Sequence, residues 1–294
     1  MSESLISLVE TCCRDLGLVI ADLNIDAVVT AKTVYTINGL QDHIPDDKSA
    51  GDAFAYVKIA VPEWRRVISY GYPTNNNVTV SRDFTGNVNA DDKLDLFFIL
   101  NPDEVKQAVN GALSELFREE RVLVALDSNN TLYDITTANP WLLTKAQVQR
   151  VGFVYTDPDN ASSVEEGAAP AYRWQESGDS LSIVLGAFPA DCTNTKLVVT
   201  ARRYYATLAA DANTTTCPLP LIRAAAKKAI LQEIWHKLDG GKAKQMFGME
   251  MVLTERDLAS ARVTWRQNIV LRDPSMEEVY RGPEVPVDQN EWDW

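Results

Sequence analysis

The sequence predicts an α+β fold in which two β-rich regions are joined by a helix. Short segments rich in Val, Ile, Thr, Tyr and Phe occur in two blocks separated by polar turns, which is typical of strands in small sheets. A helix start, Asn101-Pro102-Asp103-Glu104, lies between the two blocks. Apolar residues recur at helical spacing near the N-terminus and again after Pro218.

The first element is a short helix over residues 3–16. Leu5, Val9, Cys12 and Leu16 recur at helical spacing, so the paired cysteines are expected to face the core as small apolar residues.

Strand signals replace the helical pattern from residue 28 to about residue 100. A helix over residues 26–44 is the competing interpretation, but dense β-branched residues and Gly39 disfavour it. The expected strands are 28–37, 54–60, 66–70, 78–81 and 94–99.

The connecting helix is the clearest element in the sequence. Asn101 can cap it, Pro102 suits its first turn, and the two acids that follow favour the positive end of the helix dipole. Its apolar face is expected to contain Val105, Val109, Ala112 and Leu116.

A second β region follows the connecting helix. Segments 121–126 and 131–135 flank Asp127-Ser128-Asn129-Asn130 and predict a hairpin, while residues 157–170 predict a polar loop. Further strands are expected at 148–155, 171–175, 181–185 and 196–205.

Two helices are expected after Pro218. The first ends at Asp239-Gly240-Gly241, and the second begins at Thr254 with Asp257 in a capping-box-like arrangement. Recurrent prolines from residue 273 onward predict an extended arm. The expected organisation is an N-terminal helix (1–24), a β-rich region (25–100), a connecting helix (101–120), a second β-rich region (121–217), a helical pair (218–272) and an acidic arm (273–294).

Charge is distributed unevenly along the 294 residues, whose formal net charge is −13. Residues 218–272 hold ten Lys and Arg against five Asp and Glu, a net of +5. Residues 273–294 hold seven acids and Arg281, a net of −6. An acidic chain is unsuited to gripping nucleic acid over a broad surface, because such binding needs a basic patch.

The sequence contains no signal-peptide pattern and no apolar run long enough to cross a bilayer, so we expect a soluble protein made in a cytoplasm. Four scattered cysteines without C-x-x-C spacing argue against a disulfide framework and a zinc site.

The sequence offers little recognisable catalytic chemistry. His43 and His236 are its only histidines, and no nucleophile or phosphate-binding motif occurs. Cys192 and acid pairs such as Asp91-Asp92 and Glu165-Glu166 are interpreted as structural or solvated residues. We therefore expect no enzyme activity, no cofactor and no metal.

Large aromatic residues in the acidic arm are costly to leave in water and commonly anchor interfaces. We expect the arm to dock on a neighbouring subunit or partner. The candidate interface residues are Tyr280, Trp292, Trp294 and, on the last helix, Trp265.

Three segments resemble virion structural proteins of tailed bacteriophages, most closely neck or head-to-tail adaptor proteins. They are Arg65–Tyr70 with Val78–Val80 and Asp91–Phe97, Asn101–Leu113, and Leu197–Tyr205 with Asp211–Leu219. The resemblance covers roughly residues 30–240. It implies a dodecameric ring in the virion neck, assembled in the host cytoplasm and contacting the portal protein and a tail or neck protein. DNA would pass through the ring without specific binding, and no membrane would be involved.

This chain is longer and richer in strand than the small helical adaptors. A tail, baseplate or fibre-attachment role therefore stays open, with Trp141 and Trp174 as candidate glycan-stacking residues. A glycan hydrolase using paired acids is a third hypothesis.

Overall fold

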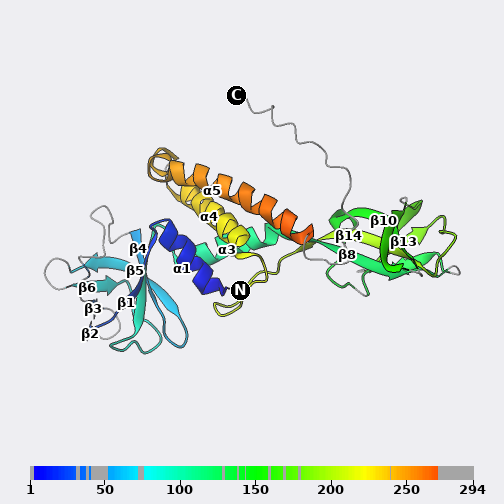
Figure 1. Ribbon diagram of the computed structural model, residues 1–294. Coiled ribbons are helices and arrows are strands. Elements are labelled where there is room, and N and C mark those ends of the chain that lie inside the picture. Colours follow the sequence, from blue (N-terminus) through cyan, green and yellow to red (C-terminus); the bar gives the residue numbers. More distant parts are fainter. Residues whose placement is uncertain are drawn as a thin grey trace, which may run out of the picture. The chain divides into compact units, whose positions relative to one another are not determined.

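The computed structural model describes residues 3–30, 34–37, 40, 52–71, 76–127, 130–137, 139–142, 144–157, 160–167, 170–177, 180–238 and 240–270. About 33% of the chain is helix and about 36% is strand, in antiparallel sheets, so the predicted α+β fold class is confirmed (Figure 1). The chain divides into two compact units: Met1–Leu116 with Tyr205–Arg262, and Phe117–Tyr204 with Val263–Trp294.

Two of the helices begin where the local sequence satisfies their free N–H groups. The Ser4 side chain accepts a hydrogen bond from the Ser7 N–H at the first helix, and Asn101 and Glu104 form a reciprocal capping box at the second. The predicted start of the connecting helix is therefore confirmed. The four α-helices of the described chain are α1 (Leu5–Asp15), α3 (Pro102–Glu115), α4 (Leu219–Lys237) and α5 (Gly240–Val270).

The first unit contains a seven-stranded antiparallel sheet with the order β1-β7-β4-β5-β6-β3-β2. Its strands are β1 (Val19–Asn24), β2 (Ala27–Thr30), β3 (Val34–Thr36), β4 (Ala53–Val57), β5 (Glu63–Tyr70), β6 (Asn77–Val80) and β7 (Lys93–Phe98).

The two edge strands of this sheet, β1 and β2, are consecutive in sequence. Only Ile25 and Asp26 separate them, so the ends they join can lie at most about 11 Å apart. The sheet must therefore curl until its edges approach each other. Backbone hydrogen bonds from Ile25 N to Asp92 O (3.0 Å) and from Asp26 N to Thr36 O (2.9 Å) hold the link.

Strands β4 and β7 are buried on both faces. Ala55, Leu94 and Leu96 point into a core enclosed by the curled sheet, where Tyr35 and Phe84 pack edge to face at 5.7 Å. The alternate residues Tyr56 and Phe97 are also buried and pack edge to face at 6.1 Å. Because alternate residues of a strand point to opposite faces, Tyr56 and Phe97 lie on the sheet's other face.

Polar contacts join that other face to the helical layer. Trp64 Nε1 on β5 donates to Asp103 on α3 at 2.8 Å, and Tyr56 Oη donates to Asp211 at 2.8 Å. Asp211 also pairs with Lys106 of α3 at 2.7 Å.

A partly buried charge cluster lies where α1 meets β1 and β7. Lys58 Nζ lies 2.9 Å from Glu10, 2.9 Å from Asp22 and 3.1 Å from Asp95, whose side chain is fully buried. Asp22 occupies a bulge in β1 with φ of 63°, and its backbone N–H donates to Asp95 Oδ1 at 2.7 Å. Burial raises the pKa of Asp95 to about 6, although the Asp22 N–H and Lys58 oppose the shift.

The second unit is a β-sandwich whose two sheets share one hydrophobic core. Val122, Leu197 and Val199 enter this core from one sheet, and Leu181 and Ile183 enter it from the other. The first sheet has the order β11-β10-β14-β8, with β8 (Phe117–Ala125), β10 (Val148–Asp157), β11 (Asn160–Gly167) and β14 (Thr195–Tyr204). The second has the order β12-β13-β9, with β9 (Leu132–Asp134), β12 (Tyr172–Ser177) and β13 (Ser180–Leu185).

Most predicted strands are found within a few residues of their expected ends, but the single strand expected at 28–37 is two antiparallel strands, β2 and β3. The predicted hairpin is also wrong. Strand β8 pairs with β14, whereas β9 pairs with β13 in the other sheet. The Asp127–Asn130 connection therefore crosses between sheets. Strands β8 and β9 each bury one face in the shared core, and they do so from opposite sheets.

Two strands were not predicted. Strand β1 lies in the region assigned to the N-terminal helix. The bulge at Asp22 interrupts the alternation of buried and exposed residues that would have indicated a strand. Strand β11 lies in the segment predicted to be a polar loop. The polar composition of this segment does not indicate a strand. The segment is a strand because its backbone pairs with β10.

The expected start of the last helix is also wrong. Helix α5 begins at Gly240, and Thr254 is a buried residue in its interior. Helix α4 ends at Lys237, and Gly240 and Gly241, which were expected to end α4, are the first two residues of α5. Burial of Ala243 and Phe247 offsets the cost of about 1 kcal/mol per helical glycine. The expected acidic arm lies outside the described residues, and no described helix is long and apolar enough to cross a membrane.

Replacing Asp95 with asparagine should change the pH dependence of unfolding. The pKa of Asp95 rises from 3.8 to about 6 on folding, so its contribution is most favourable below pH 3.8 and is lost as the pH rises through about 6. The unfolding free energy of the wild type relative to Asp95→Asn should therefore fall by about 2 kcal/mol between pH 4 and pH 7. Urea unfolding across this range measures the difference.

Asp22→Asn is the matched comparison within the same cluster. A hydrogen bond from Lys58 lowers the pKa of Asp22, so stability relative to this variant should be lost as the pH falls. Parallel pH profiles for the wild type and Asp95→Asn would contradict the assignment of Asp95.

Candidate interaction surface

The basic side chains of α4 are paired with acids inside the first unit. Arg223 and Lys227 contact two acids of the N-terminal segment, Lys228 contacts α5 and Lys237 contacts α3. The closest approaches are Arg223–Glu3 at 2.9 Å, Lys227–Asp15 at 2.6 Å, Lys228–Glu255 at 3.2 Å and Lys237–Glu104 at 2.7 Å. Much of the positive charge of the helical pair is therefore neutralised within the fold.

Helix α5 has two apolar faces. One contains Ala243, Phe247, Thr254 and Leu258, which are all less than a tenth exposed. The opposite side has its own large apolar residues, which we call the outer face of α5. Its members are Met246 (42% exposed), Met249 (69%), Val252 (63%) and Leu253 (48%).

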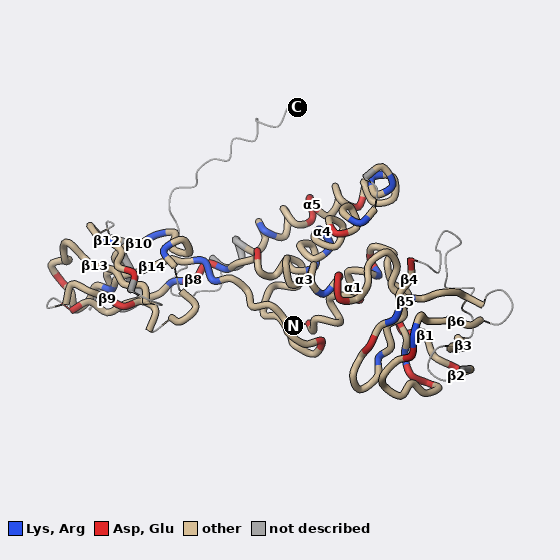
Figure 2. The backbone as a smooth tube through the Cα atoms, turned by 180° about the vertical axis from the view of Figure 1, so that it is seen from behind, with Lys and Arg blue, Asp and Glu red and all other residues tan. Residues whose placement is uncertain are grey.

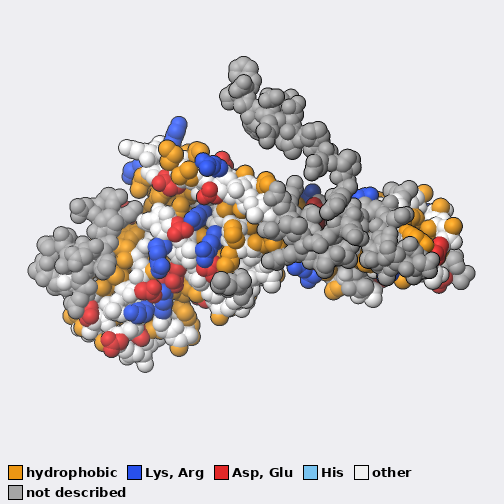
Figure 3. Space-filling model, viewed as in Figure 1, with side chains coloured by type: hydrophobic (Ala, Val, Ile, Leu, Met, Phe, Trp, Pro, Cys, Tyr) orange, Lys and Arg blue, Asp and Glu red, His pale blue; other side chains and the backbone are white. Residues whose placement is uncertain are grey.

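The outer face of α5 also presents two cations. At 100° per residue, Lys242 and Arg256 fall on the same side of the helix as Met249. Both are exposed, and within the described part of the chain neither forms an ion pair. Glu250 and Asp257 lie along one border of the face. Apolar and basic side chains therefore alternate over this part of the surface, and Figure 3 shows both kinds in the region of α5.

A clustered apolar face of this kind differs from scattered exposed residues. Single exposed hydrophobic residues are normal on protein surfaces, whereas contiguous ones mark interaction sites. The four apolar residues occupy two turns of one helix, so they form a continuous strip. The outer face of α5 is therefore the best candidate interaction surface of the first unit.

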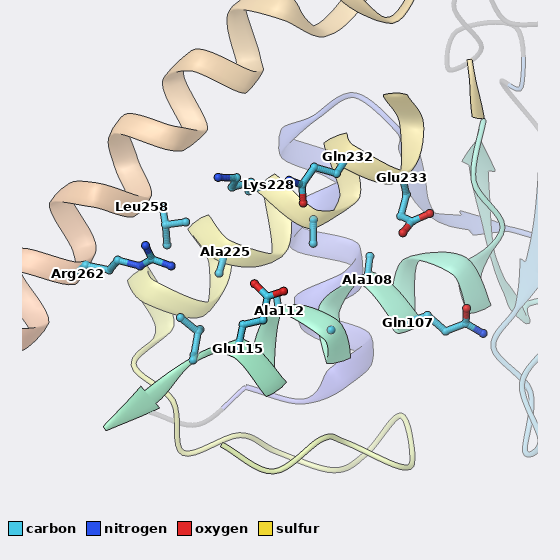
Figure 4. Close-up of a pocket in the computed structure, with 13 residues that line it drawn as sticks. Gln107, Ala108, Ala112, Glu115, Ala225, Lys228, Gln232, Glu233, Leu258 and Arg262 are labelled. Carbon is cyan, nitrogen blue, oxygen red and sulfur yellow. The ribbon is translucent and has the colours of Figure 1, made fainter. Parts of the chain in front are cut away.

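A groove of about 310 Å³ lies between α3, α4 and α5 (Figure 4). Its floor consists of small residues, and its charged lining mixes two acids with two bases. Figure 4 shows Glu115 extending from α3 and Arg262 from α5 toward this space. The small floor residues are Ala108, Gly111, Ala112, Ala225 and Ala229. This groove lacks the nucleophile or metal-ligand cluster that a catalytic site needs.

Arginines gather at one end of the sandwich unit, where Figure 2 shows blue positions on β8, β10 and β14. Arg118 and Arg203 both bind Glu120, at 3.0 and 3.1 Å. The Arg202 guanidinium lies 4.7 Å from the Phe117 ring centre. In the first unit, Arg65 pairs with Glu63 at 2.5 Å. Members of both sequence doublets, Arg65-Arg66 and Arg202-Arg203, are thus engaged within the chain.

The two tryptophans considered for glycan stacking are partly used by the fold. Trp141 packs against the sandwich core and carries the Arg203 guanidinium 5.3 Å from its ring centre. Trp174 packs against the same core and meets Tyr172 edge to face at 5.6 Å. Each ring is therefore partly covered by contacts within the fold.

A second, mostly apolar hollow of about 370 Å³ lies in the sandwich unit. Phe153, Tyr155 and Phe188 contribute aromatic rings to it. Carbohydrate sites also need several polar groups to fix the hydroxyls. This lining therefore suits an apolar ligand better than a glycan.

Of the four predicted interface residues, only Trp265 lies in the described part of the chain. It follows Leu258 and Ala261 along the packed side of α5 and is half-buried, with an indole N–H that has no hydrogen-bond partner there. Trp265 is thus not part of the outer face. Tyr280, Trp292 and Trp294 lie outside the described residues, so their interface role stays a prediction.

The other candidate chemical groups do not converge on one site. His236 is exposed on α4, and Asp92 accepts the Asn89 N–H at 2.7 Å in a turn. Burial raises the pKa of the Cys12 thiol to about 12 and also raises that of Cys13. No group of three or more potential metal ligands occurs among the described residues. The Glu165 and Glu166 side chains and His43 lie outside them.

Comparison with protein-family models, curated proteins and solved structures finds no match to this chain.

The outer face of α5 was missed by sequence reasoning because the helix was expected to begin at Thr254. Met246, Met249 and Leu253 have the spacing of a helical stripe, which would have revealed a second apolar face once α5 was extended to Gly240.

Two leucines of α5 test whether one face of the helix is packed and the opposite face is exposed. Leu258→Ala should lower the unfolding free energy by about 2–4 kcal/mol, because Leu258 is 5% exposed and its loss leaves a cavity. Leu253→Ala removes the same atoms from a residue that is 48% exposed, and should cost no more than about 0.5–1 kcal/mol. Chemical unfolding measures both, and equal losses would contradict the assigned faces.

Proposed function

We propose that this chain is a structural subunit of a tailed-bacteriophage virion. In this proposal it assembles with copies of itself into a ring at the neck, joins the portal of the head to the tail, and lets DNA pass. The single observation that carries self-assembly is the outer face of α5, an apolar and basic strip that stays exposed among the described residues of the chain.

Ring formation follows physically if this face meets a different surface on the next copy. A contact between unlike surfaces is head-to-tail, and it closes into a ring when the rotation between neighbours closes. Each copy then both presents its outer face and covers that of another. A closed ring also makes weak individual contacts sufficient, because every subunit is held by two neighbours.

The station at the neck is supported by the resemblance of the three sequence segments to adaptor proteins. The portal and a tail or neck protein are the partners that this resemblance suggests. The net charge of −13 supports passage of DNA without specific binding, because like charges repel.

The proposed assembly predicts that purified protein associates through the outer face of α5. Met249→Asp places a charge on a side chain that is 69% exposed, so the monomer should still fold. Self-association should weaken about tenfold or more, as expected when a central apolar contact of an interface is replaced by a charge. Mass photometry and sedimentation velocity over a concentration series measure this change.

Val61→Asp is the matched control, since Val61 is 71% exposed but lies in a loop of the first unit away from α5. It should associate like the wild type. A wild-type chain that stays monomeric over the whole concentration series would sink the proposed function, as would a Met249→Asp variant that associates normally.

A further inference from the structure

We infer that the outer face of α5 is the docking site for the C-terminal segment, residues 273–294, of a second copy of this chain. The inference rests on the proposed self-assembly and names the partner of its interaction surface. Four features of the molecule carry it: the charge left on α5, the apolar strip, the composition of the segment and its reach.

The charge argument begins with the pairing of α4. Its four cations Arg223, Lys227, Lys228 and Lys237 are bound to acids of the same unit. On the outer face of α5, Lys242 and Arg256 form no ion pair within the described residues. This face therefore keeps two cations available to a partner.

The C-terminal segment has the opposite charge. It holds seven acids and one arginine, a net of −6. Attraction between this segment and the cations of α5 would steer the encounter and would weaken as salt screens it. The acids at the border of the outer face, Glu250 and Asp257, would in turn fix the register by repelling acids of the segment.

Charge alone would not hold the segment, and the aromatic residues supply the apolar area. Trp292 and Trp294, which lie in the part of the segment that covers the face, can each bury about 150–250 Å², on the order of 400 Å² in total. A standard interface buries about 800 Å² per partner. One such contact is thus of the right order for a moderate interaction, which a closed ring would reinforce. Met246 and Met249 suit this role because flexible thioether side chains adapt to aromatic rings.

The segment is long enough to reach another subunit. The outer face from Lys242 to Arg256 spans about 21 Å at 1.5 Å per residue. Roughly seven extended residues cover that length, so Asn290–Trp294 and the two residues before them suffice. The 17 residues 271–287 then remain as a tether of up to about 55 Å from the end of α5.

The two hollows fit the segment less well than the outer face does. The groove between α3, α4 and α5 is lined by two acids, Glu115 and Glu233, and two bases, Lys228 and Arg262. Its lining has no net charge and does not favour an acidic ligand. The apolar hollow of the sandwich unit is lined by aromatic and proline residues and by no cation.

A complementation experiment tests the inference with two full-length variants. The face variant, Met249→Asp, keeps the C-terminal segment intact. The segment variant, Tyr280→Ser with Trp292→Ser and Trp294→Ser, keeps the outer face intact. Each is measured alone and in an equimolar mixture by mass photometry and sedimentation velocity, beside the wild type and the Val61→Asp control.

The expected result is that neither variant associates alone and that the mixture forms one-to-one pairs. Only one productive contact exists in the mixture, so the pairs should not grow into larger assemblies. Their dissociation constant should rise with salt, and Lys242→Met with Arg256→Met should flatten that dependence.

The remaining outcomes separate this inference from the proposed function. A segment variant that assembles like the wild type, while the face variant does not, overturns the inference but leaves self-assembly through α5 intact. A mixture that stays monomeric where the wild type assembles shows that the segment of one copy does not bind the outer face of another, and also overturns the inference. A monomeric wild type overturns the proposed function itself.

Discussion

The first unit depends on the two-residue link between opposite edges of its seven-stranded sheet. Ile25 and Asp26 force the sheet to curl, and the curl encloses the core formed by residues such as Tyr35, Phe84 and Leu96. The other face of β4 and β7 is then free to pack on helices. Lys58 joins that face to α1 by binding acids from α1, β1 and β7 together. The short link between β1 and β2 thus determines which face of the sheet is left for the helices.

The helical layer in turn determines which charges remain available to a partner. Helix α4 lies among the other helices, so its cations find acids on α1, α3 and α5. Helix α5 packs through one side only and leaves its other side to solvent, with apolar and basic residues together. A hydrophobic strip of that kind is costly in water unless a partner covers it. Its presence gives the proposed assembly a physical driving force.

The sandwich unit is organised differently, because its core is shared by two sheets. Buried residues of β8, β10 and β14 meet those of β9 and β13 in one cluster. Its arginine-rich end is largely neutralised or stacked internally, through Glu120, Phe117 and Trp141. Composition alone would not distinguish such a structural arginine cluster from an anion-binding surface, whereas the ion-pair and ring distances do.

The sequence by itself determined the local elements whose signals are short-range. Asn101 and Glu104 fixed the start of α3 through a capping box, and dense β-branched residues fixed most strands. The tertiary structure decided everything that depends on partners distant in sequence: the pairing of β8 with β14, the strand β11, and the start of α5 at Gly240. It also decided the outer face of α5, because a helix buries whichever apolar face its neighbours cover. Spacing shows that Met249 and Leu258 lie on different sides, but only packing shows which side remains exposed.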